Sequence, residues 1–141
     1  MFSKACQYAI RAVLFLASET SHGQRIGVKE IAEALEVPGP FLAKLLQQLT
    51  RNGLISSVKG PHGGFFLSEA DRSRSLKEVA ECIDGPQVFS TCILGLPICS
   101  SENPCPLHKE ALAYRQGLLQ IVGHNSIGEI ALQIRQRDLK H

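Results

Sequence analysis

The fold is decided by one stretch of the chain, residues 28–68, which reads VKEIAEALEVPGPFLAKLLQQLTRNGLISSVKGPHGGFFLS. Its first apolar side chains recur at i, i+3, i+4 and i+7, the spacing of a short amphipathic helix: Val28, Ile31, Ala32 and Leu35. A turn follows at Val37-Pro38-Gly39-Pro40, and its second proline suits the first position of a new helix, which needs no amide donor. That helix has a leucine stripe (Leu42, Leu45, Leu46 and Leu49) and ends at Asn52-Gly53.

A β-hairpin is predicted directly after this second helix. Two short runs suited to strands, residues 54–59 and 65–68, flank the glycine-rich turn Gly60-Pro61-His62-Gly63-Gly64. Helix, turn, helix and hairpin in this order are the plan of a winged helix-turn-helix. In such domains the second helix of the pair enters the major groove of DNA.

Further helices are predicted on both sides of this stretch. Lys4–Ser18 is apolar on nearly every face, which indicates a helix buried on several sides. The capping boxes Ser75-x-x-Glu78 and Ser126-x-x-Glu129 open two more helices. From near Pro106, apolar residues alternate at spacings of four and three, a heptad seam that pairs with another helix: Leu107, Ala111, Tyr114, Leu118 and Ile121. We expect Gly123 to interrupt that helix.

The predicted fold class is therefore mainly α: a winged helix-turn-helix DNA-binding domain with a small β-hairpin wing, plus a long dimerisation helix. Four segments are expected. Residues 1–84 form the DNA-binding domain, 85–106 a cysteine-rich loop, 107–135 the dimerisation helix and C-terminal helix, and 136–141 a polar tail that frays. Residues 87–104 show no helical or strand period, and loops of this length are often functional.

Composition narrows the class of protein. Hydrophobic residues make up 44% of the 141 residues and charged residues 20%, which is typical of a folded domain. The net charge is only +2, but residues 1–60 carry +3 and the remainder −1, which permits phosphate contact without demonstrating it. No apolar run approaches the roughly 20 residues that span a bilayer, so we expect a cytoplasmic protein without a membrane partner. The sequence contains no phosphate-binding loop, carboxylate pair or nucleophile elbow, so we expect neither an enzyme nor a small-molecule substrate.

The helix after the turn is the candidate recognition helix. Its leucine stripe would pack inward, which leaves Lys44 and the glutamines facing the base edges and Arg51 facing phosphate. In the wing, Lys59 adds charge, the glycines allow close approach to a phosphate, and His62 can enter the minor groove. The predicted DNA-binding residues are Lys29, Pro40, Phe41, Lys44, Gln47, Gln48, Arg51, Lys59, Gly60, His62 and Gly63. The alternative is that Lys44 to Arg51 is an ordinary solvated helix face.

Three of the five cysteines lie within fourteen residues, in the pattern Cys92-x6-Cys99-x5-Cys105-x2-His108. In a cytosolic chain such a group is more typical of metal binding or redox chemistry than of disulfides. Thiolates bind iron–sulfur clusters and imidazole can replace one of them, while structural zinc sites favour shorter gaps between paired cysteines. Zinc, a metal-free thiol switch and inert cysteines stay open as alternatives. Cys6 and Cys82 lie in apolar helical patterns and are predicted to be core residues.

On these residues the chain resembles the iron–sulfur cluster regulator family of winged-helix transcription factors (IscR- and NsrR-type, the Rrf-two family). The matching stretches are Tyr8–Ala12, Ile31–Glu33, the segment from Leu45 to Ile55, and above all Ser57–Phe65. The resemblance covers nearly the whole chain, and the wing stretch is fairly specific to the family. It implies a twofold homodimer that binds a palindromic promoter site in double-stranded DNA, with half-sites about one helical turn apart.

The resemblance also bears on the cysteine loop. IscR-like members use three cysteines and a histidine, whereas NsrR-type members borrow an acidic residue from the partner's first helix. Here that helix carries Gln7 and Tyr8, and no acidic residue precedes Glu19. The resemblance therefore implies a 2Fe–2S cluster on Cys92, Cys99, Cys105 and His108, which would report iron, oxidants or nitric oxide. The alternative is a repressor of the same family without a cluster, controlled by thiol oxidation or a partner protein.

Overall fold

The structure is a computed structural model that describes residues 2–20, 23–90, 94, 102, 104–134 and 136–139. The element order is α1 (Lys4–Glu19), α2 (Val28–Leu35), α3 (Gly39–Arg51), β1 (Ser56–Val58), β2 (Gly64–Phe66), α4 (Glu69–Arg72), α5 (Leu76–Asp84), α6 (His108–His124), α7 (Ile127–Ala131) and the 3₁₀ helix η1 (Gln136–Leu139). The predicted fold class is confirmed, since the chain is mainly helical with one two-stranded antiparallel sheet. None of the described helices is both long and apolar enough to cross a membrane.

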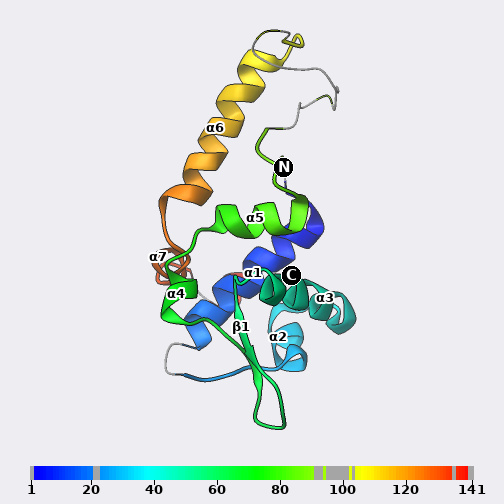
Figure 1. Ribbon diagram of the computed structural model, residues 1–141, viewed down its shortest axis with the longest axis vertical. Coiled ribbons are helices and arrows are strands. Elements are labelled where there is room, and N and C mark those ends of the chain that lie inside the picture. The colour runs from blue at the N-terminus through cyan, green and yellow to red at the C-terminus, as the bar shows by residue number, and fades with distance from the viewer. Residues whose placement is uncertain are drawn as a thin grey trace.

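The core is built around α1, which contacts α2, α3, α5 and α7 (Figure 1). Its side chains are buried all round the helix, among them Ala9, Ala12, Val13 and Leu16. This arrangement explains why the segment shows little amphipathic pattern. A helix that is covered on several sides has no solvent-exposed face on which charged residues would gather.

The helix-turn-helix is formed by α2 and α3. Ile31 and Leu35 of α2 and the leucine stripe of α3 are buried together, as the spacing predicts. The turn between them contains Glu36 at φ +60°, the one left-handed residue other than glycine in the described part of the chain. Pro38 is the N-cap of α3, so the proline-flanked turn sets where the recognition helix begins.

The wing hairpin pairs Ser56 with Phe66 and Val58 with Gly64. A further backbone bridge joins Phe65 to Ile26, with N–O distances of 3.0 and 2.8 Å. Gly64 lies at φ +149°, and a Cβ built on it would sit 2.8–2.9 Å from three backbone atoms of Ile26. The segment before α2 therefore packs against the wing only because residue 64 has no side chain.

We expect Gly64→Ala to lower the free energy of unfolding by about 2 kcal/mol or more, because the new methyl group meets backbone that cannot rotate away. Chemical denaturation of the two proteins measures the difference. Gly27→Ser is the control: Gly27 is the N-cap of α2 with open space around it, so serine there should be neutral or slightly stabilising. Equal stability of the Gly64 variant and the unaltered chain would contradict the clash.

Three features differ from the sequence-based expectations. Residues 69–72 form the extra short helix α4, and α6 runs through Gly123 to His124. The sequence predicts a frayed tail, but η1 contacts α1 and Leu139 is only 2% exposed. Helix α7 also packs on α1, so the C-terminal segment returns to the core of the DNA-binding domain. Periodicity misses such contacts because one apolar residue in a polar tail carries no pattern.

Helix α6 projects from the body of the molecule, and the wing hairpin projects from the opposite end (Figure 1). Only Ala111 and Val122 of α6 are buried, whereas Leu107, Tyr114 and Ile121 are 46%, 50% and 68% exposed. These three residues are spaced by seven and so share one face of the helix. Three of the five predicted seam residues are thus uncovered in a single chain, whereas Ala111 is buried and Leu118 is half-buried against the core.

Candidate nucleic-acid interface and cysteine loop

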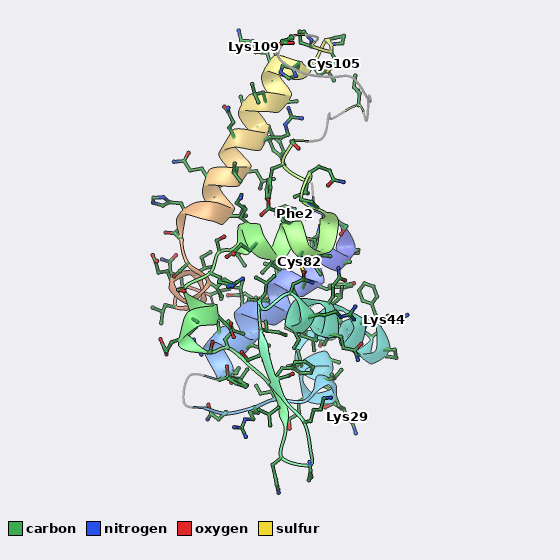
Figure 2. The ribbon with its side chains drawn as sticks, in the orientation of Figure 1. Phe2, Lys29, Lys44, Cys82, Cys105 and Lys109 are labelled. Atoms are coloured by element: carbon green, nitrogen blue, oxygen red, sulfur yellow. The ribbon has the colours of Figure 1, made fainter. Side chains whose placement is uncertain are left out.

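The recognition helix α3 turns its leucine stripe into the core and leaves the opposite face exposed. Pro40, Phe41, Lys44, Gln47 and Arg51 are all exposed. Figure 2 shows Lys44 directed outward from α3, with Lys29 of α2 on the same side of the molecule, at the end that carries the hairpin. Exposed side chains of both helices therefore lie on one side of the molecule.

A groove of about 490 Å³ separates α3 from the wing. It is lined by Gln47, Thr50, Arg51, Ser57, Val58, Lys59, Gly64 and Phe65. Two cations, Arg51 from the helix and Lys59 from the hairpin, thus border one concave surface. A groove of this kind suits a phosphate backbone, which binds guanidinium and ammonium groups in place of its counterions.

The wing tip is exposed at Lys59, Gly60 and His62. Gly60 lies at φ +105° and its carbonyl accepts a hydrogen bond from the Gly63 amide at 3.0 Å. A Cβ on Gly63 would lie 2.0 Å from the Val58 carbonyl oxygen. The turn itself therefore requires glycine at position 63, in addition to any close approach to DNA.

Gln48 is the predicted DNA-binding residue that the structure places elsewhere. It is half-buried, and its Nε2 donates to the Cys82 carbonyl at 3.0 Å, while the Cys82 thiol lies 3.9 Å from the Gln48 carbonyl. This reciprocal pair joins α3 to α5. On one helix, residues 47 and 48 point about 100° apart, so only Gln47 reaches the groove.

A second contact that the sequence did not reveal supports the start of the recognition helix. The ring of Phe41 meets Tyr8 of α1 edge to face, with centroids 5.5 Å apart. The Arg11 guanidinium lies 5.2 Å from the Tyr8 ring, a cation–π distance. Helix α1 therefore holds the N-terminal turn of α3, which is the part nearest the base edges in this fold.

The cysteine loop leaves the domain at the end of α5, beside the N-terminus of α1. The Asp84 carboxylate accepts hydrogen bonds from the Ser3 amide at 2.9 Å and from the Ser3 hydroxyl. Ser3 is itself the N-cap of α1. Phe89 packs edge to face on Phe2 at 6.0 Å. The first residues of the loop are thus fastened to the first residues of the chain.

Cys6 is fully buried beside this contact, as predicted for a core residue. Burial, together with the charge of Asp84 and a hydrogen bond to it, raises the pKa of the Cys6 thiol to about 12. Burial also raises the pKa of Cys82, which is half-buried between α5 and α3. Neither thiol is activated as a nucleophile.

We expect Cys6 to resist alkylation in the folded protein. A pKa of about 12 lowers the thiolate fraction at pH 8 roughly a thousandfold relative to an ordinary thiol, and burial slows the reaction further. Iodoacetamide labelling followed by peptide mass mapping measures this for each cysteine, with the same protein in denaturant as the reference. Labelling of Cys6 as fast as in denaturant would contradict the assignment.

The loop returns to the helical part of the chain at Cys105 and His108. Both are half-buried, and the His108 amide donates to the Cys105 carbonyl at 3.0 Å, so one turn at the start of α6 carries both side chains. Figure 2 shows Cys105 at the end of the molecule farthest from the wing. Within the ranges that the structure describes, no three metal-ligating side chains gather. The other two predicted ligands, Cys92 and Cys99, lie outside those ranges.

Comparisons with known proteins agree with a winged helix-turn-helix regulator. A family model described as Rrf2, iron-dependent transcriptional regulator, matches residues 2–132. A protein named as an HTH-type transcriptional regulator in Aquifex aeolicus (strain VF5) is 34% identical over 110 residues, which cover 77% of this chain and 75% of that protein. IscR of Klebsiella pneumoniae (strain 342) is 28% identical over 124 residues, which cover 88% and 75%.

Two solved structures share the fold. CymR, the global cysteine regulator of B. subtilis, aligns with a TM-score of 0.76 at 18% identity, over 96% of this chain and 98% of that one. IscR from T. potens aligns with a TM-score of 0.73 at 18% identity, over 96% and 89%. The expectation that the chain is not an enzyme agrees with a family of regulators. By the family match over almost its full length, and by its relatives, this chain belongs to the Rrf2 family of transcriptional regulators.

Proposed function

We propose that the chain is a homodimeric regulator that binds palindromic double-stranded DNA and senses iron, redox or nitric oxide status through a 2Fe–2S cluster in the cysteine loop. The observation that carries the DNA-binding mode is the groove between α3 and the wing, where Gln47, Arg51 and Lys59 converge beside the exposed face with Lys44. Helix α3 would enter the major groove, and the wing would contact the adjacent backbone.

Dimerisation is supported by the uncovered seam of α6. Three large apolar side chains at heptad spacing, Leu107, Tyr114 and Ile121, are about half exposed or more. A projecting helix with an apolar stripe gains stability when the stripe of a second copy covers it. Two chains joined along α6 would carry two recognition helices, which is what a palindromic site requires.

The donor set of the loop fits an iron–sulfur cluster. Cys105 and His108 lie on one turn, and the Nε2 atom of His108 is shielded from solvent, as a ligand nitrogen should be. Cys92 and Cys99 complete the set in the sequence. A bound cluster supplies a group that oxidants, nitric oxide or iron shortage can alter or remove. The two similar proteins named IscR agree with this proposal.

The contacts at the end of α5, where the cysteine loop begins, connect the loop to the recognition helix α3. Asp84 fastens the end of α5 to the N-cap of α1, and two residues earlier Cys82 is hydrogen-bonded to Gln48 of α3. A change in the order of the loop would therefore act on the segment that positions α3. A coupling free energy of about 1–3 kcal/mol is sufficient for a useful switch.

The test is anaerobic purification with iron and sulfide quantification, followed by DNA binding of the loaded and the stripped protein. The DNA probe is obtained by selecting duplexes from a random-sequence pool with this protein. We expect brown protein, selected sites with twofold symmetry, and affinities of the two forms that differ by roughly 5- to 150-fold. Arg51→Ala should weaken binding and lower the salt dependence by about one phosphate equivalent or less, whereas Lys109→Ala, at the far end of α6, should not.

The two parts of the proposal fail separately. Colourless, iron-free protein that still binds a symmetric duplex would remove the cluster and leave control by thiol oxidation or a partner protein. One zinc ion per chain would indicate a structural zinc site instead. Absence of any selected duplex, with no salt-dependent binding, would overturn the DNA-binding mode itself.

A further inference from the structure

The polar residues of the described core gather at the base of the wing. Among the residues that the structure describes, two polar side chains are almost completely buried, Thr20 at 3% exposure and Asp71 at 6%. Neither belongs to the hairpin, but each accepts a hydrogen bond from one of its two ends. Burial of a polar group costs free energy unless the group is hydrogen-bonded. Loss of either of these two contacts would therefore destabilise the fold.

Asp71 holds the beginning of the hairpin. Its Oδ2 atom accepts a hydrogen bond from the hydroxyl of Ser56, the first residue of β1, at 2.7 Å. The same oxygen accepts from the Ser68 amide at 3.1 Å, and Ser68 caps α4 in return. The bond to Ser56 is charge-assisted and partly buried, and its loss would leave the buried Asp71 carboxylate with one partner fewer.

Thr20 holds the end of the hairpin. Its hydroxyl donates to the Leu16 carbonyl at the end of α1 at 2.5 Å, and it accepts from the amide of Leu67 at 3.2 Å. Leu67 is the residue directly after β2 and is itself buried. Each end of the hairpin is therefore hydrogen-bonded to a buried polar side chain, the first end to Asp71 and the second to Thr20. Both acceptors belong to the helical part of the domain.

The other capping boxes of the chain show that this use of Asp71 is not a general property of such motifs. In α5 and α7 the corresponding acids, Glu78 and Glu129, accept from the amides of their own N-caps and remain half-exposed or exposed. Only the acid of α4 is buried and reaches a strand. Helix α4 has only four residues and is too short to be stable on its own. The hydrogen bond from Ser56 to its capping acid Asp71 joins this short helix to the wing.

We propose that Thr20 and Asp71 are positioning residues for DNA binding: they set the angle between the wing and α3, and so place Lys59 opposite Arg51. The groove between helix and wing has Arg51 on one wall and Lys59 on the other, so its width depends on that angle. If the hairpin swings, Asp71 is left buried with one acceptor bond fewer. The inference rests on the proposed contact of the wing with DNA.

The test is a double-mutant cycle between Ser56→Ala and Lys59→Ala, measured by binding to the selected duplex over a salt series. Ser56→Ala removes the tie to the wing and leaves the cap of α4 intact. We expect it to weaken binding roughly tenfold and to lower the salt slope by up to about 0.9, as the loss of one phosphate contact does. In the Lys59→Ala background it should have little further effect.

Two further variants separate positioning from simple loss of stability. Ser126→Ala removes the serine that caps α7, whose hydroxyl accepts from the Glu129 amide and not from the hairpin, and should lower thermal stability with unchanged salt slope. Ser56→Thr keeps the hydroxyl and should restore normal binding. Normal binding by Ser56→Ala, or losses that add fully to those of Lys59→Ala, would overturn the inference. If Lys59→Ala itself leaves affinity and slope unchanged, the proposed wing contact fails first, and the inference with it.

Discussion

Replacing Ile121 with glutamate is expected to convert the proposed dimer into monomers and to weaken binding to a palindromic duplex by roughly 100-fold or more. Ile121 is the most exposed residue of the α6 seam at 68%, one heptad from Tyr114. A carboxylate at that position would be buried without a partner in a dimer joined along α6, which costs several kcal/mol. A monomer also loses the gain of about 10²–10⁴ that comes from engaging two linked half-sites.

Sedimentation equilibrium and DNA binding measure the two effects on one preparation. Gln116→Glu is the matched control, because Gln116 is exposed on the other side of α6, in a hollow that also contains Lys77 of α5. That variant should remain a dimer with normal affinity. A dimeric Ile121→Glu protein with normal affinity would show that the interface lies elsewhere.

Replacing Cys99 with alanine is expected to abolish the visible absorption of the anaerobically purified protein and most of its iron. A cluster needs its thiolate ligands, and the predicted set of three cysteines and one histidine leaves no spare cysteine or histidine in the loop. The same loss is expected for Cys105→Ala and for His108→Ala, whose residues share the first turn of α6. The difference in DNA affinity between loaded and stripped protein should disappear with the colour.

Cys82→Ala is the control for these ligand variants. Cys82 lies between α5 and α3, outside the loop, and its raised pKa disfavours the thiolate that a metal would need. It should keep full colour and iron content. Unaltered absorption and iron in the Cys99 variant would show that the predicted ligand set is wrong.

Much of the fold could be predicted because its signals are local. The leucine stripe of α3, the proline-flanked turn before it and the glycine-rich hairpin after it are each contained within a dozen residues. Periodicity and turn chemistry report such features directly. The face with Lys44, Gln47 and Arg51 follows from the same spacing, since the side opposite a buried stripe is exposed.

The assignments that changed concern residues whose partners lie far away in the chain. Gln48 has the same chemistry as Gln47 and lies next to it, but only the position of α5 decides that it binds the Cys82 carbonyl. Leu139 looks like part of a polar tail until α1 is beside it. In both cases the two partners are too far apart in the chain for a local sequence pattern to include them together.

The sequence by itself determined most of the helices, the hairpin, the heptad pattern of α6 and the family, because each depends on neighbours within a few turns or on a shared motif. Only the tertiary structure decided how the wing is held. Ser56 and Asp71 are fifteen residues apart and Thr20 and Leu67 forty-seven, and nothing in their local patterns indicates a bond. The physical reason is that a buried hydrogen bond is selected by the cost of leaving its acceptor unpaired, and that cost exists only after the chain has closed around it.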